Sequence, residues 1–407
     1  MINTPIAALT ASDLDALVTN KVAEGRHLEF KRDLPGTSEK DKIELCADVP
    51  SLANTGGGYL LFGVDDSDST ASAVPGLPGV NIDHEIRRLE QTLGSGIDPP
   101  VQGITTRSIP TSAGGDVIAV RVPRSWRAPH LVKHNDSFRV YVRASKGKQL
   151  LDAREVRRVF ESAGDVVGAI RRWRDDRLAK ILADDTPVRL KVGAKMVLHI
   201  VPLESIDDPY RFTASEIADR RREFGRLGFG GRGERINLDG YLTSAPPIAS
   251  GRLVNGEVEG SYGQVFRSGR FEGVRSESVT YGHEDRFIAS HGYEKRVLEA
   301  TAGSIRTLTG LGVSFPIVVM LSFLGSQGVS LLIKHDDEDS DDQPIDRDVV
   351  VLPDVVLEEE PTDLPRALRP IFDAVWNACG LPASQNYDEQ GNWARGELPG
   401  VPMSRVE

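Results

Sequence analysis

The chain has 407 residues, 39% of them hydrophobic, with a formal net charge of −11 and two cysteines. This composition is typical of a globular protein of two or three domains, and it excludes wholesale disorder and a disulfide-stabilised scaffold. The sequence has no run of about 18 apolar residues and no basic-then-apolar leader, so we expect a cytoplasmic protein without a membrane partner.

The first part of the sequence alternates between helical and strand patterns. Helices are predicted from Ser12, from Ser38, over 82–93 and over 152–161, where capping residues precede apolar residues at helical spacing. Strands are predicted around Leu28 and at 59–64, 101–107, 116–122 and 138–142. We therefore expect a mixed α/β domain over residues 1–163.

The second part of the sequence predicts another domain. An amphipathic stretch at 165–184 predicts a connecting helix within 164–186. Later strands are predicted at 195–201, 263–266, 315–323, 329–333 and 348–352, and helices at 293–308 and 363–379. The acidic run in the loop 336–348 is typical of a solvated segment. The fold class predicted is α/β (α+β), a mixed-sheet N-terminal domain followed by an α+β domain over 187–407.

Three acidic positions flank two predicted strands of the first domain. In the segment Glu24-Gly-Arg-His-Leu-Glu29-Phe-Lys31 the strand side chains alternate, so Glu29 and Lys31 share one face. The next apolar strand stops at Asp65 and Asp66. If the two strands are neighbours, Glu24, Glu29 and one of these aspartates converge. Three carboxylates around one point favour a hard divalent cation, because their mutual repulsion otherwise raises their pKa values.

The sequence joins several motifs: Glu24-x4-Glu-x-Lys, then Ala53-Asn-Thr-Gly-Gly-Gly with Gly-Val-Asp-Asp, then Pro129-His130 and Phe138-Arg-Val-Tyr-Val-Arg. Together they resemble the Schlafen core domain, also known as an AlbA-type nucleic-acid-binding domain, over about residues 10–162. The resemblance implies an endoribonuclease that cleaves tRNA or rRNA in members that keep the acidic trio. In other members it implies a nucleic-acid-binding or regulatory module. A role in defence or stress response is a further implication, and Pro50, inside a predicted helix, departs from the family pattern.

The function predicted from these features is metal-dependent endoribonuclease activity on structured RNA, so RNA is favoured over DNA as partner. Glu24, Glu29 and Asp65, with Asp66 as the alternate to Asp65, are predicted to hold Mg²⁺ or Mn²⁺. The predicted role of Lys31 is to stabilise the negative charge that develops on the scissile phosphate.

Basic residues are concentrated in the first part of the chain. Residues 1–180 carry 25 Lys and Arg against 24 Asp and Glu, whereas the remainder carries 24 against 36. Local clusters decide binding, because salt screens distant charges. The predicted nucleic-acid-binding residues are Arg139, Arg143, Lys146, Lys148, Asn54 and Gly57. A second basic cluster spans 171–177, where intervening aspartates offset the charge.

Two other classes of function are compatible with the sequence. One is a non-catalytic protein that binds DNA or RNA and regulates transcription or a neighbouring system, with the C-terminal half as sensor or partner domain. The other is a nucleotide-responsive protein, although the sequence has no P-loop motif. We also expect that the C-terminal domain mediates any homo-oligomer or protein partnership. The same basic face serves enzyme and binding module alike, so the sequence does not separate them.

Overall fold

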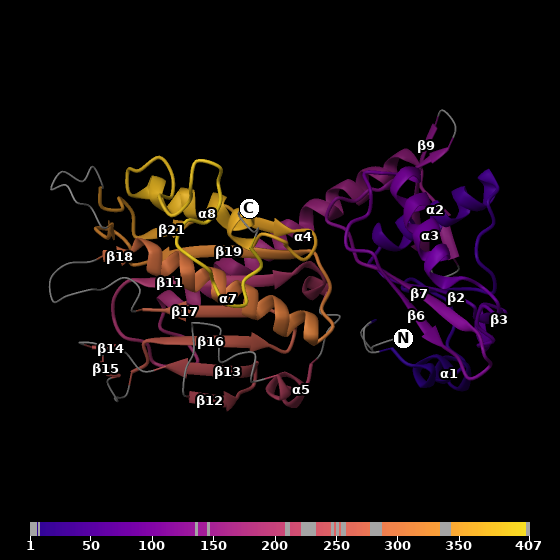
Figure 1. Cartoon of the computed structure of the whole chain (residues 1–407), viewed down its shortest axis with the longest axis horizontal. Helices are drawn as coiled ribbons and strands as arrows, with labels where there is room; N and C mark the ends of the chain where they lie inside the picture. The colour runs from indigo at the N-terminus through magenta and orange to yellow at the C-terminus, as the bar shows by residue number, and fades with distance from the viewer. Residues whose placement is uncertain are drawn as a thin grey trace. The chain divides into compact units, whose positions relative to one another are not determined.

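A computed structural model describes residues 6, 9–134, 137–144, 147–207, 212–220, 233–245, 248–249, 252–253, 258–276, 287–333 and 343–403. The chain divides into two compact units, Met1–Ala169 and Ile170–Glu407, each described here by itself (Figure 1). The division falls inside helix α4 (Ala153–Leu182), within the predicted connecting segment. The sequence predicted two helices here, but α4 is continuous, since a lone glycine such as Gly164 costs a helix only about 1 kcal/mol.

The first unit contains a four-stranded sheet in the order β1-β2-β7-β6. Its strands are β1 (Leu28–Lys31), β2 (Gly58–Phe62), β7 (Asp116–Val122) and β6 (Thr105–Pro110). The predicted neighbours β1 and β2 pair in parallel, with Leu28 opposite Tyr59 and Lys31 opposite Phe62. The apolar strand therefore ends at Phe62, and the two aspartates belong to a separate hairpin of β3 (Asp65–Ser67) and β4 (Thr70–Ala73).

Three helices pack on this sheet: α1 (Ala11–Thr19), α2 (Glu39–Ala53) and α3 (Ile82–Gly96). The predicted cap of α2 is confirmed, since the Ser38 hydroxyl accepts from the Asp41 amide. The predicted cap of α1, Ser12, is wrong. The N-cap is Thr10, which forms a capping box with Asp13, so Ser12 lies inside the helix. Helix α2 runs through Pro50, which is buried in its last turn.

A second sheet of the first unit packs against α2, in the order β10-β9-β8-β5. Its antiparallel strands are β5 (Ile97–Asp98), β8 (Leu131–His134), β9 (Ser137–Ala144) and β10 (Gly147–Leu150). Val132 joins the core formed by α2, α3 and the first sheet, and Tyr141 packs against that core. Helix α2 therefore has one sheet on either side.

The second unit is built on one large antiparallel sheet in the order β12-β13-β16-β17-β11-β19-β21, with β22 also paired to β19. The strands are β11 (Lys195–Pro202), β12 (Gly233–Ile236), β13 (Gly240–Ala245), β16 (Ser261–Phe266), β17 (Phe271–Arg275), β19 (Ile317–Leu324), β21 (Val349–Val351) and β22 (Val355–Leu357). Helices α7 (Ser290–Gly310) and α8 (Leu364–Ala378) cover one face (Figure 1). The last turns of α4 cover the other, through Leu178 and Ile181.

Shorter elements complete the second unit. They are η2 (Leu203–Asp207), α5 (Ala214–Asp219), β14 (Ile248–Ala249), β15 (Arg252–Leu253), β18 (Phe287–Ala289) and β20 (Ser330–Leu332). The predicted α+β fold class is confirmed. The acidic run from Asp336 to Asp342 lies outside the described residues. Within the described residues, no helix is both long and apolar enough to cross a membrane.

Candidate functional site

Strand β1 carries the central residues of the predicted site. Leu28 and Phe30 are buried in a core shared with α1, as the alternation predicted. Glu29 lies on the opposite face but is also buried, with 6% of its surface exposed. The ammonium of Lys31 donates to the Glu29 carboxylate at 2.8 Å. The predicted carboxylate and ammonium are therefore adjacent, with Glu29 buried and the side chain of Lys31 31% exposed.

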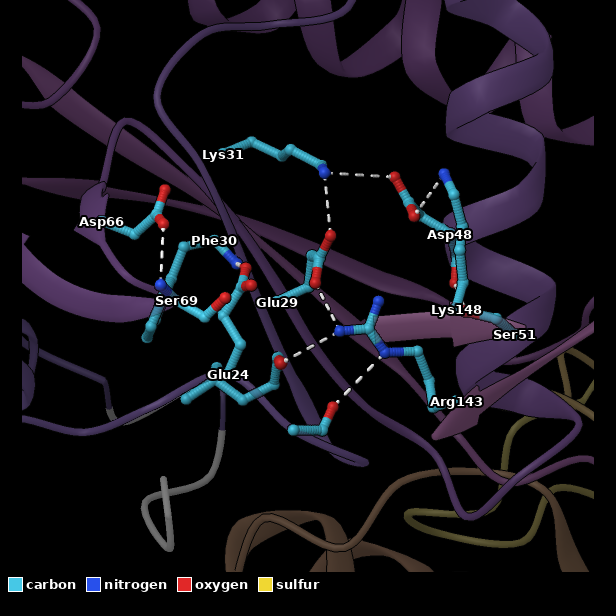
Figure 2. Close-up of polar contacts among 12 residues, drawn as sticks. Glu24, Glu29, Phe30, Lys31, Asp48, Ser51, Asp66, Ser69, Arg143 and Lys148 are labelled. Carbon is cyan, nitrogen blue, oxygen red and sulfur yellow. Dashed lines mark hydrogen bonds and ion pairs between the residues drawn. The ribbon is translucent and has the colours of Figure 1, made fainter. Parts of the chain in front are cut away.

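Oppositely charged side chains alternate in a row around Glu29 and Lys31 (Figure 2). Glu29 is paired with Lys31 and with Arg143 of β9. Lys31 lies 3.7 Å from a carboxylate oxygen of Asp48 in α2, and Asp48 is 2.9 Å from the ammonium of Lys148 in β10. We call Arg143, Glu29, Lys31, Asp48 and Lys148 the charge string. It links β1 of the first sheet to β9 and β10 of the second, across α2.

Arg143 lies inside the unit rather than on its surface, with 2% of the residue exposed. Its guanidinium donates to the Glu29 carboxylate and to the backbone carbonyls of Gly25 and Leu28, at 3.3 and 3.5 Å. Its backbone amide donates to the Thr55 hydroxyl at 2.8 Å. The predicted nucleic-acid-binding Arg143 and the predicted metal-binding Glu29 are therefore partners of one another.

The pKa shifts in the charge string follow from burial and pairing. Burial alone favours neutral Glu29, but hydrogen bonds from Arg143 and Lys31 outweigh it and lower the pKa of this carboxyl. Burial also opposes the charge of Lys31, yet Asp48 and Glu29 raise its pKa above the ordinary value. Lys31 is thus a fixed cation and is unsuited to accept a proton. Burial raises the pKa of Asp48 against the pull of Lys148 and Lys31.

Glu24 is half-buried beside this string. Its carboxylate accepts from the Phe30 amide at 2.8 Å (Figure 2). Burial raises the pKa of Glu24, and the charges of Glu29 and Asp66 add to the effect. Asp65 instead pairs with Arg32 at 2.9 Å. The charge of Asp66, the predicted alternate, acts on Glu24, and a register shift in the hairpin separates Asp65 from Asp66.

The acidic residues do not form a fitting donor set for a metal ion in this arrangement. No group of three or more His, Cys, Asp or Glu residues able to hold a metal occurs among the described residues. Each carboxylate oxygen of Glu29 already has a cationic partner, Lys31 on Oε1 and Arg143 on Oε2. A Mg²⁺ or Mn²⁺ ion needs about six oxygen ligands and a site free of competing cations.

Two of the predicted nucleic-acid-binding residues have structural partners. The Asn54 amide donates to the carbonyls of His130 and Tyr141, at 3.1 and 2.9 Å, and its oxygen accepts from the His130 amide at 2.8 Å. Asn54 therefore joins the end of α2 to the second sheet. Gly57 has φ +73°, and a Cβ there would lie 2.6 Å from the Arg124 backbone nitrogen. Only glycine suits that turn.

The remaining predicted basic residues differ in exposure. Lys148 is held by Asp48, Arg139 is exposed, and Lys146 lies outside the described residues. The basic cluster at 171–177 belongs to the second unit. Three of its four arginines pair within that unit, Arg171 and Arg174 with Asp354 and Arg177 with Glu272.

The predicted site lacked two exposed residues of the same hairpin as Arg139, namely Lys133 and Phe138. Phe138 is 57% exposed and lies directly opposite Lys133 in the register of β8 and β9. The available signal was the position of Phe138 at the start of a predicted strand, directly after the polar run His134-Asn-Asp-Ser.

Residues 24–152 match the family model described as Schlafen, AlbA_2. The chain carries a Schlafen AlbA_2 domain. The match covers the charge string, Glu24 and both aspartates, and it ends just before α4. It confirms the family that the sequence motifs resembled.

Two solved structures are similar to part of the chain. One is a protein from Corynebacterium diphtheriae, with 18% identity and a TM-score of 0.24, covering 36% of this chain and 27% of that one. The other is the N-terminal domain of a Nitrosomonas europaea protein described as related to the ATP-dependent DNA helicase RecG. It has 24% identity and a TM-score of 0.24, covering 36% of this chain and 96% of that domain. The chain thus spans about a quarter of the Corynebacterium protein, and both TM-scores are below 0.5. No curated protein matches the chain.

Proposed function

We propose that the Schlafen AlbA_2 domain of this protein binds nucleic acid through its β8–β9 hairpin. The observation that carries the proposal is the exposed trio Lys133, Phe138 and Arg139, which we call the hairpin surface: Lys133 and Phe138 lie on one face of the hairpin, and Arg139 lies on the other. The family match relates the domain to nucleic-acid functions. The structure leaves this trio exposed while Arg143 and Lys148 are held by carboxylates.

The hairpin surface combines the two features that single strands of nucleic acid require. Lys133 and Arg139 provide positive charge for phosphates, and the exposed ring of Phe138 provides a face on which a base stacks. The sequence from 131 to 144 contains one acidic residue, Asp136, against Lys133, Arg139 and the internally paired Arg143. We favour RNA over DNA, as the family resemblance implies, and single strands over duplexes, because a stacking ring needs an unpaired base.

The test measures binding of the full chain to fluorescently labelled oligonucleotides by anisotropy, over a range of salt concentrations. Each phosphate contact on a single strand adds about 0.7 to the slope of log affinity against log salt. Replacing Lys133 and Arg139 together by Gln should therefore lower that slope by about 1.4. An unchanged slope in the folded double variant would move the interface elsewhere.

The role of Phe138 has a matched control in the same unit. Phe138→Ala should weaken binding by about 1–3 kcal/mol, the usual worth of one stacked base. Phe160 is similarly exposed, at 60%, but lies on α4 beside the Arg157–Glu161 ion pair. Phe160→Ala should leave the affinity unchanged. Equal losses in both variants would indicate general destabilisation or a different surface.

A metal-dependent endoribonuclease is the second candidate function. The family resemblance favours it, and the charges of Glu29 and Asp66 contribute to the raised pKa of Glu24, but the described residues do not form a metal donor set in this arrangement. The test incubates the full chain with total tRNA and rRNA, in Mn²⁺ or in EDTA. Metal-dependent fragments that Glu29→Gln abolishes would support cleavage, whereas binding without fragments would support the regulatory module. In either case the second unit stays a predicted sensor or partner domain.

A further inference from the structure

We infer that Arg143 is the resident cation of the acidic cluster: its guanidinium, supplied by β9, neutralises Glu29, and the cluster is built to hold that guanidinium rather than a divalent metal. Here the acidic cluster means Glu24, Glu29 and Asp66. The inference is independent of the proposed nucleic-acid binding, which concerns the hairpin surface.

Burial makes the pair of Arg143 and Glu29 a fixed feature of the interior. The side chain of Arg143 is 1% exposed and that of Glu29 is 8% exposed (Figure 2). The guanidinium also donates from Nε to the Gly25 carbonyl and from Nη2 to the Leu28 carbonyl, so its position is set by several contacts. Taking either charge away leaves the other buried without a partner, which is strongly unfavourable.

The end of α2 fixes the strand that delivers Arg143. Thr55 accepts the backbone amide of Arg143 at 2.8 Å, and Asn54 donates to the Tyr141 carbonyl at 2.9 Å, two residues earlier on β9. These contacts hold β9 in the position that brings residue 143 to β1. The Asn-Thr pair that resembles the family motif therefore positions the guanidinium in this chain.

Electrostatics then opposes a metal at Glu29. Lys31 lies 2.8 Å from Oε1, and Arg143 contacts Oε2, so two cations already share the carboxylate. A divalent ion at this carboxylate would stand within a few ångströms of both. Repulsion falls only as the inverse of the distance, and the double charge of the ion doubles its repulsion by each of the two cations.

The test measures Mn²⁺ binding to the full chain, by the EPR signal of free Mn²⁺. Arg143→Met removes the charge and keeps most of the buried stem. It should bind Mn²⁺ at least ~10-fold more tightly than the wild type, because one repelling cation is gone. Adding Glu29→Gln to Arg143→Met should abolish the gain. The control is Arg158→Met, at an exposed arginine of α4 in the same unit, which should bind Mn²⁺ like the wild type.

A wild type that binds Mn²⁺ through Glu29, with no gain in Arg143→Met, would overturn the inference. A second measurement remains informative even if Arg143→Met does not fold. In EDTA, Glu29→Gln should lower the midpoint of thermal unfolding, because it leaves Arg143 buried without its counter-ion. An empty metal site predicts the opposite sign, since removing one of several repelling carboxylates stabilises it. A raised or unchanged midpoint would therefore refute the resident-cation role.

Discussion

Glu294 in α7 provides a test of how burial changes the pKa of a carboxyl group in the second unit, and with it the stability of that unit. Its carboxyl is buried between α7 and α8 and accepts from the Trp376 indole and the Ser384 hydroxyl, both at 2.8 Å. The Tyr293 hydroxyl is a further donor at 3.2 Å. Burial raises the pKa of Glu294 to about 7, from an ordinary value of 4.5, against the effect of these hydrogen bonds.

The sign and size of the resulting pH dependence follow from proton binding. Below pH 4.5 the carboxyl is neutral in both folded and unfolded chains. Between pH 4.5 and about 7 the folded chain binds more protons, so the free energy of unfolding falls as pH rises, by about 1.4 kcal/mol per pH unit. Above about pH 7 both forms are ionised and the fall ends. The total loss is about 3 kcal/mol.

We expect Glu294→Gln to remove this loss, because glutamine does not ionise and has nearly the same volume. The variant should gain about 3 kcal/mol relative to the wild type when pH rises from 4.5 to 8. The assay is urea unfolding of the full chain, followed by tryptophan fluorescence at both pH values. Glu299→Gln, on the same helix and paired with Lys295 at 3.9 Å, is the control. The same difference between variant and wild type at both pH values would refute the assigned burial effect.

Two further predictions concern other buried polar groups. Arg177→Met should destabilise the second unit by about 3–5 kcal/mol, because it leaves fully buried Glu272 without its guanidinium partner. Urea unfolding checks this, and a loss below 1 kcal/mol would show the pair to be dispensable. Asn54→Ala should cost about 1–3 kcal/mol by leaving three backbone groups without partners. Hydrogen exchange at the His130 amide checks this, and unchanged protection would contradict it.

Local sequence patterns were enough to predict most of the helices and strands of this protein. Alternating side chains placed Leu28 and Phe30 in the core, and the Ser38 cap began α2 where predicted. The family motif was readable for the same reason, since its spacing lies within single strands and turns. The predicted N-cap of α1, Ser12, was two residues too late. Thr10 and Ser12 are both suitable N-cap residues, and such residues differ little in energy. Short strands such as β12 and β17 were missed, since few residues carry their pattern.

Only the tertiary structure decided which charges meet. Glu29 and Arg143 are 114 residues apart, and no local pattern reveals that β9 turns this arginine inward. The different surroundings of Asp65 and Asp66 likewise depend on how the β3–β4 hairpin is placed. Asp65 pairs with Arg32, whereas the charge of Asp66 acts on Glu24. Periodicity predicts which face of a strand a side chain occupies. Whether that face meets solvent, a carboxylate or a guanidinium depends on elements distant in sequence, whose packing against one another sets burial and pairing.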